Sequence, residues 1–335
     1  MERQYKDKTI FYLLCHKQSS PPSSAMAAPP PPPSNIGLRT ILSESRRIFR
    51  AHTWHFQALS VLFLLPFSFF LSVYPFIYQQ NPPIFFYPIR PFISILIYTL
   101  ILSFFSIFAV GSITHSVFHG FYGQPVKLLS AIKEASTSFF PLISTAFVES
   151  LIVSGINLIL GLVFFALLKT TQILGFQVHH SSSFLILLCL AYLIILTSIS
   201  LYLRVNWTFA YVIVVVESSW GIEPLKRSQI LVKGMKGVAF KILLFFGFFI
   251  SINILQSIMI SGDSAGDDWK SWDFILNIVA TTAFYMVLLL YSLAACTVFY
   301  VYSKALQGEL AEQFAGEYVS LPFDDGKAPH VVSIV

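Results

Sequence analysis

Six long apolar runs constrain this chain more than any other feature of its sequence. They cover about residues 57–78, 92–116, 141–168, 183–203, 238–260 and 274–301, and the fourth can continue towards residue 216. A helix needs about 20 consecutive apolar residues to cross the hydrocarbon core of a bilayer. Lipid tolerates only backbone that satisfies its own hydrogen bonds. The sequence therefore predicts an all-α membrane protein with six transmembrane helices.

The composition supports a membrane protein and argues against a soluble domain or a nucleic-acid-binding protein. Of the 335 residues, 56% are hydrophobic and 11% are charged, whereas soluble domains carry about 25% charged residues. The formal net charge is +5, but the basic residues lie between apolar runs and form no RNA-binding signature. We therefore expect the lipid bilayer as a partner and no direct contact with nucleic acid.

Composition also divides the chain into three parts. Residues 1–35 contain the proline run Pro29–Pro33 and are predicted to be disordered. Met26 resembles a second start of translation, so residues 1–25 are interpreted as an optional extension. Residues 36–310 form the predicted six-span membrane domain, and residues 311–335 form a polar C-terminal tail.

A polar interval, residues 217–235, separates the fourth and fifth runs. Pro224 suits the first turn of a helix, where its missing N–H is not needed. Helical spacing then separates an apolar face from a cationic face. The apolar face holds Leu225, Ser228, Leu231, Val232 and Met235, and the opposite face holds Lys226, Gln229, Lys233 and Lys236. We expect this helix to lie flat on the interface, with its lysines towards anionic headgroups; the alternative is an ordinary connecting helix with solvated lysines.

Two further segments have the same amphipathic character. In residues 36–51 the expected apolar face holds Leu38, Ile41, Leu42, Ser45, Ile48 and Phe49. In residues 125–139, which Pro125 opens, it holds Leu128, Leu129, Ile132, Ala135 and Phe139. Each of the three helices precedes two spans, so the sequence indicates a threefold helix-span-span repeat over about residues 36–116, 125–203 and 222–303.

The basic residues near the span ends predict the orientation. Six spans place both termini on one side of the membrane. The cations expected on that side are Arg39, Arg46, Arg47, Arg50, Lys127, Lys133, Arg204, Lys226, Arg227, Lys233, Lys236, Lys241 and Lys304. Those expected on the other side are Arg90, Lys169 and Lys270. Cytoplasmic loops carry the excess of Lys and Arg, so both termini and all three amphipathic helices are predicted to be cytoplasmic, in the endoplasmic reticulum, another endomembrane or the plasma membrane.

The stretch ESSWGIEPLKRSQILVKG resembles a known pattern, in which an acidic residue and a glycine precede a Lys/Arg-Ser-x-x-Leu-Val-Lys-Gly helix. The matching residues are Glu217, Gly221, Lys226, Arg227, Ser228, Leu231, Val232, Lys233 and Gly234. The pattern is similar to the membrane domain associated with bacterial glycerophosphodiester phosphodiesterases. Over about residues 36–310 the chain also resembles a plant family of uncharacterised transmembrane proteins, some of whose names imply an interaction with a polyadenylate-binding protein.

The resemblance implies a fold rather than an activity. The soluble phosphodiesterase barrel and its metal-binding acidic residues are missing from this sequence, so the activity does not carry over. Gly-rich phosphate loops, HExxH and GxSxG motifs are also missing. We therefore expect no enzymatic activity, no cofactor and no metal site.

Polar residues inside the third apolar run are the other candidate site, because such groups are costly in lipid and often functional. They are Glu149, Ser150, Ser154 and Asn157. Their spacing lets several of them face one bundle interior. They form either a polar substrate path or interhelical hydrogen bonds, each worth about 0.6–2 kcal/mol. The carboxylate is expected to be protonated or paired, with Arg204 as one partner.

Three functions remain open at this stage. The first is a non-enzymatic endomembrane protein that organises lipids or a cytoplasmic partner protein through Lys226, Arg227, Lys233 and Lys236. The second is a transporter or channel with a polar path at Glu149. The third is a lipid-metabolising membrane enzyme, for which the sequence offers no catalytic constellation.

Overall fold

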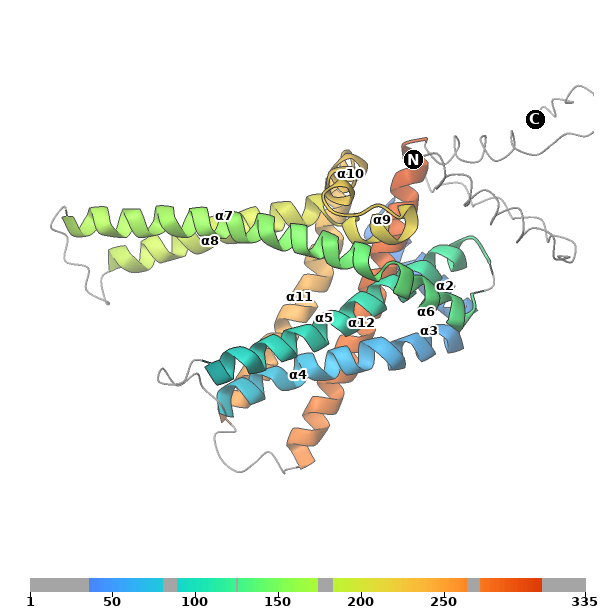
Figure 1. Cartoon of the computed structure of the whole chain (residues 1–335), viewed down its shortest axis with the longest axis horizontal. Coiled ribbons are helices and arrows are strands. Elements are labelled where there is room, and N and C mark those ends of the chain that lie inside the picture. The colour runs from blue at the N-terminus through green and yellow to red at the C-terminus, as the bar shows by residue number, and fades with distance from the viewer. Residues whose placement is uncertain (1–35, 81–88, 125, 174–182, 264–271, 309–335) are drawn as a thin grey trace, which may run out of the picture. The chain divides into compact units, whose positions relative to one another are not determined.

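The computed structural model describes residues 36–80, 89–124, 126–173, 183–263 and 272–308. These residues form helices and contain no strand. In chain order the elements are α2 (Leu38–Ala51), α3 (Thr53–Leu59), the π-helical turn η1 (Ser60–Leu64), α4 (Leu65–Gln80), α5 (Ile89–Phe121), α6 (Leu128–Thr137), α7 (Phe139–Ile173), α8 (Ser183–Asn206), α9 (Ala210–Glu217), α10 (Glu223–Val232), α11 (Lys236–Asp263) and α12 (Trp272–Leu306) (Figure 1). The predicted disordered N-terminus, the whole of the predicted polar tail and Pro125 lie outside the described residues.

The six predicted spans are confirmed within the described part of the chain. Six helical segments are long and apolar enough to cross a membrane: Thr53–Tyr74, Ile93–Phe121, Phe139–Thr171, Leu185–Glu217, Lys236–Gln256 and Phe274–Leu306. The protein is therefore an all-α, multi-pass integral membrane protein. The predicted order of one amphipathic helix followed by two spans also recurs three times, beginning at α2, α6 and α10.

The first span contains a local change of helix type next to its proline. Pro66 has no N–H and cannot satisfy the carbonyl four residues before it. The turn that leads into it, η1, is π-helical. Such adjustments let neighbouring groups satisfy freed backbone atoms in membrane helices. The hydroxyl of Tyr98 on α5 donates a hydrogen bond of 2.7 Å to the carbonyl oxygen of Phe70, which links α5 to the first span.

The apolar face of α2 packs on the bundle as the sequence predicts. Its buried residues are Ile41, Ser45, Ile48 and Phe49. The Phe49 ring meets that of Tyr291 edge-on at a centroid distance of 4.9 Å. Because Tyr291 belongs to α12, α2 lies along the C-terminal half of the last span. These side chains share one core with buried residues of α5, α9, α10 and α12.

The helix α10 also packs its apolar face on protein, whereas a helix that lies alone on the membrane interface turns that face to lipid. Leu225, Ser228, Leu231 and Val232 are buried, at most 2% exposed. The end of α12 is tied to the same helix, because the side-chain amide of Gln307 donates to the carbonyl oxygens of Ile230 (3.3 Å) and Leu231 (3.1 Å). Burial in the bundle removes more apolar surface from water than a shallow interfacial position, which explains the difference.

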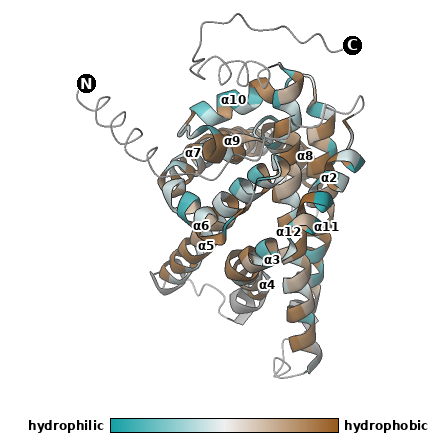
Figure 2. Ribbon diagram, turned by 90° about the vertical axis from the view of Figure 1, so that its right-hand side faces the viewer, coloured by the Kyte–Doolittle hydropathy of each residue, from teal (hydrophilic) through white to brown (hydrophobic). Residues whose placement is uncertain are grey.

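The helix α6 buries only part of the face that the sequence predicts, since Ile132 packs against the core but Leu128 is exposed. Ala131 and Ala135 are buried, whereas Leu129 is 82% exposed. A Cβ atom on Gly111 of α5 would lie 2.9 Å from the Cα of Ala135. Small residues on both helices thus allow a close backbone approach, and this contact decides which face of α6 turns inwards. Figure 2 shows hydrophilic residues on α6 and α10, against the apolar bodies of the spans.

The third and fourth spans pack least. None of the residues in their most apolar windows is buried, whereas 39% of those in the first span are. Helices α7 and α8 run side by side (Figure 1), and the rings of Phe164 and Tyr192 stack at 4.5 Å. Their remaining apolar surface is available to lipid.

Candidate functional site

The predicted motif folds into the corner between α8, α9 and α10, and Glu217 is its charged centre. The Tyr300 hydroxyl donates a hydrogen bond of 2.7 Å to Oε1 of Glu217. The Lys304 ammonium lies 3.3 Å from the same oxygen, and Nε of Arg227 lies 3.5 Å from Oε2. The side chains of Glu217, Lys304 and Arg227 are 22%, 14% and 32% exposed. One carboxylate therefore joins the ends of α9 and α12 to α10.

Ser228 supports the same corner at a break in the fourth span. The break separates α8, which ends at Asn206, from α9, which begins at Ala210. The Phe209 N–H donates to Oγ of Ser228 at 3.1 Å, and the Ser228 hydroxyl donates to the carbonyl oxygen of Asn206 at 2.8 Å. Ser228 is 0% exposed. Its hydroxyl therefore satisfies two backbone groups that the interrupted helix leaves open.

Two glycines set the path of the chain on either side of α10. Gly221 and Gly234 have φ values of +74° and +101°, a region that side chains other than glycine rarely adopt. The Gly221 N–H also donates to Oγ1 of Thr145 on α7 at 3.1 Å. The motif positions Glu217, Gly221, Ser228 and Gly234 thus have structural roles.

The predicted basic face divides into two groups. Lys226, Lys233 and Lys236 are exposed, and the Lys236 ammonium lies 5.5 Å from the ring centroid of Tyr202. Arg227 instead turns towards Glu217 and is held in the ion pair. The exposed cationic surface therefore consists of Lys226 on α10, Lys233 directly after it and Lys236 at the start of α11.

The polar residues of α7 do not converge. The Tyr211 hydroxyl donates a hydrogen bond of 2.6 Å to Oε2 of Glu149. Ser150, Ser154 and Asn157 are exposed on the surface of α7. Among the described residues no salt bridge joins Glu149 to Arg204. Glu149 is thus tied to α9, and the four side chains do not form one interior polar face.

Sequence reasoning missed the distant partners of these residues, which are Tyr300, Lys304, Tyr211 and Thr145. Tyr300 and Lys304 are spaced one helical turn apart at the end of the last span, and this spacing is the one available signal.

Within the described ranges no group of three or more His, Cys, Asp or Glu residues is placed to hold a metal ion. The rings of His115 and His119 on α5 lie 4.3 Å apart between centroids and are tilted by 58°.

Comparison with known proteins gives one family. Residues 89–324 match the family described as "Domain of unknown function (DUF8558)". This range begins at the first residue of α5 and includes Glu149 and the whole motif corner. Searches of the curated proteins and of the solved structures give no match. The resemblance to the membrane domain of bacterial glycerophosphodiester phosphodiesterases stays a prediction. Because the match covers more than half of its length, the chain belongs to the DUF8558 family.

Proposed function

We propose that this multi-pass membrane protein is non-enzymatic and binds anionic lipid headgroups through the exposed lysines in and directly after α10, so that it organises lipids, or a partner protein, at the membrane surface. One observation carries the proposal. The apolar face of α10 is buried in the bundle, while Lys226, Lys233 and Lys236 are exposed. The buried face of α10 therefore keeps Lys226 on the outside, and Lys233 and Lys236 lie between the end of α10 and the start of the fifth span.

The distribution of Lys and Arg residues supports a position of these helices at an anionic, cytoplasmic membrane surface. Each Lys or Arg near an anionic leaflet contributes about 1 kcal/mol of attraction. The excess of cations at the helix-bearing ends of the spans favours a cytoplasmic position for these helices and for both termini. A cytoplasmic leaflet of the endoplasmic reticulum, another endomembrane or the plasma membrane provides the anionic headgroups that such a surface requires.

The resemblance to the phosphodiesterase membrane domain is part of the same proposal. Because Glu217, Gly221, Ser228 and Gly234 hold the α8–α10 corner together, a shared motif implies a shared fold and not a shared reaction. A solved structure of such a membrane domain without an equivalent serine-bridged corner would contradict this kinship.

The test is lipid retention by the reconstituted full chain. We would compare wild type with the triple variant Lys226→Gln, Lys233→Gln, Lys236→Gln, which leaves Arg227 and its ion pair intact. The matched control is Arg90→Gln, Lys169→Gln, Lys270→Gln, which removes the same charge from the span ends predicted to lie on the other side. Phosphatidylserine and phosphatidylcholine retained after purification are counted by native mass spectrometry.

We expect the lysine variant to lose affinity for phosphatidylserine by about 30- to 150-fold, since two to three contributions of about 1 kcal/mol are removed. The control is expected to retain phosphatidylserine as wild type does. Equal retention by all three proteins would refute the proposal. Retention of lipid together with loss of a specific bound protein would assign the surface to a partner instead.

A further inference from the structure

A second cationic surface lies on α2, outside the residues that match the family. An open groove of about 470 Å³ is lined by Leu42, Ser43, Arg46, Arg47 and Arg50. The spacing of three, four and seven residues from Ser43 to the arginines puts them on one face of the helix. All three arginines are exposed, and they lie opposite the face that α2 buries.

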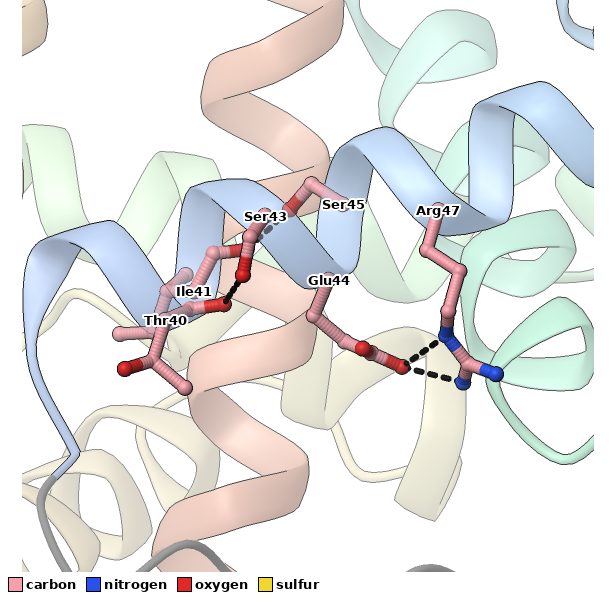
Figure 3. Close-up of polar contacts among 6 residues, drawn as sticks. All are labelled: Thr40, Ile41, Ser43, Glu44, Ser45 and Arg47. Atoms are coloured by element: carbon pink, nitrogen blue, oxygen red, sulfur yellow. Dashed lines mark hydrogen bonds and ion pairs between the residues drawn. The ribbon is translucent and has the colours of Figure 1, made fainter.

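The packing of α2 fixes this face in place. Ile41 and Ser45 are 0% exposed and Ile48 is 2% exposed on the buried side. Arg47 is oriented by Glu44, to which its guanidinium is hydrogen-bonded through two nitrogens (Figure 3). This pair raises the pKa of Arg47 above its ordinary value, chiefly through the hydrogen bond from Arg47 to Glu44. The groove therefore has a preformed cationic wall.

The other two arginines lack such a partner. Within the described ranges, no hydrogen bond or ion pair is made by the guanidinium groups of Arg46 and Arg50. Like charges four residues apart on a helix repel each other. Binding of an anion between them would relieve this repulsion, and Glu44 cannot do so because it already holds Arg47.

The groove also lies next to the first candidate span. That span begins at Thr53, two residues after α2 ends. Trp54 is 85% exposed and follows Arg50 by four residues, across the break at His52; tryptophan is typical of the headgroup level. The arginines of α2 are therefore presented where lipid phosphates are found.

We propose that Arg46, Arg47 and Arg50 form a binding site for a phosphomonoester group, as carried by the headgroup of an anionic lipid. A guanidinium matches phosphate oxygens with two parallel hydrogen bonds, which an ammonium cannot do. Because Glu44 is paired with Arg47, the three arginines and Glu44 together keep a net charge of +2, which suits a dianion. Leu42 provides an apolar wall for the rest of the lipid. The inference rests on the proposed function in that both require anionic lipid, but it names a lipid class and a separate site.

Selectivity is the measurement that separates this site from a diffuse charged surface. The full chain is placed in phosphatidylcholine nanodiscs that contain either phosphatidic acid, which has a phosphomonoester headgroup, or phosphatidylserine at equal total charge. Lipid retained by the protein is counted by native mass spectrometry. The site variant is Arg46→Gln, Arg50→Gln, and the matched control is Lys226→Gln, Lys233→Gln, which removes the same charge from α10.

Wild type is expected to prefer phosphatidic acid by about tenfold, the effect of one charge-assisted contact. The site variant should lose this preference, and the α10 control should keep it while retaining less of both lipids. Absence of a preference in wild type, or its loss to the same degree in the control, would overturn the site. Phosphatidylserine retention in the control reports the function proposed for α10, so the two proposals fail separately. Arg46 and Arg50 are exposed, so their substitution should leave the melting temperature unchanged. Measuring that temperature checks that the variants fold.

Competition identifies the source of the phosphate. A tenfold excess of inorganic phosphate over the lipid should leave the preference unchanged if the ligand is a lipid headgroup held partly by Leu42. Displacement of phosphatidic acid by inorganic phosphate would support the same phosphomonoester site with a soluble ligand. A preference that persists in the site variant would refute both assignments.

Discussion

Replacing Ser228 with alanine should destabilise the protein more than its single hydroxyl group implies. The change removes the acceptor for the Phe209 N–H and the donor for the Asn206 carbonyl oxygen, which now lie at 3.1 and 2.8 Å from Oγ. Both groups belong to the break between α8 and α9. Because Ser228 is 0% exposed, water does not reach the vacated site without a rearrangement of α10.

The magnitude follows from the two unsatisfied backbone groups. Each buried group left without a partner costs about 1–3 kcal/mol. Hydrogen bonds between membrane helices average nearer 0.6 kcal/mol because the surroundings relax. A loss of about 2–4 kcal/mol is therefore expected, which corresponds to a fall of roughly 4–10 °C in the melting temperature of a chain of this size.

Thermal melting in detergent, followed by size-exclusion chromatography, measures this effect. The matched control is Ser136→Ala, because the Ser136 hydroxyl is exposed and donates only to the Ile132 carbonyl oxygen of its own helix, at 3.0 Å. The control should melt within about 2 °C of wild type, as surface substitutions usually do. If both variants melt together, the bridge across the break contributes nothing and the account of the motif serine is wrong.

Three further predictions address other parts of the structure. Glu217→Gln should lower the free energy of unfolding by about 1–2 kcal/mol, since Lys304 and Arg227 lose their carboxylate while the Tyr300 hydroxyl keeps an oxygen acceptor. Thermal melting of this variant is compared with that of Glu223→Gln, which changes an exposed glutamate, and equal melting temperatures would contradict the prediction. Gly111→Ala should cost about 1–3 kcal/mol through overpacking against Ala135, whereas Gly161→Ala, whose Cβ meets nothing within 4 Å, should be neutral or stabilising in the same assay. Proteoliposomes with wild type or Glu149→Gln should show the same low flux of small solutes, because Ser150, Ser154 and Asn157 do not join Glu149 in one interior face; flux that the substitution abolishes would establish the transporter function instead.

Local patterns explain what could be predicted for the candidate site. The helical phase of residues 224–235 correctly separates the buried Leu225, Ser228 and Leu231 from the exposed lysines. Periodicity cannot say whether an apolar face meets lipid or protein, because both environments exclude water equally well. For this reason the sequence did not show that the apolar face of α10 packs on protein. It also did not show that α6 turns Ala131 inwards beside Ala135, where the close approach to Gly111 decides the contact.

The sequence by itself determined the number of spans, the three amphipathic helices and the class of the protein, because apolar length and helical periodicity depend only on neighbouring residues. The tertiary structure alone decided the partners of the charged and polar groups. Glu217 meets Tyr300, 83 positions further along the chain, and Glu149 meets Tyr211, 62 positions further along. Such pairs depend on how α9, α7 and α12 pack, and no local pattern records that packing. The same packing holds the arginines of α2 on one fixed outer face, since burial of Ile41, Ser45 and Ile48 leaves them no other direction.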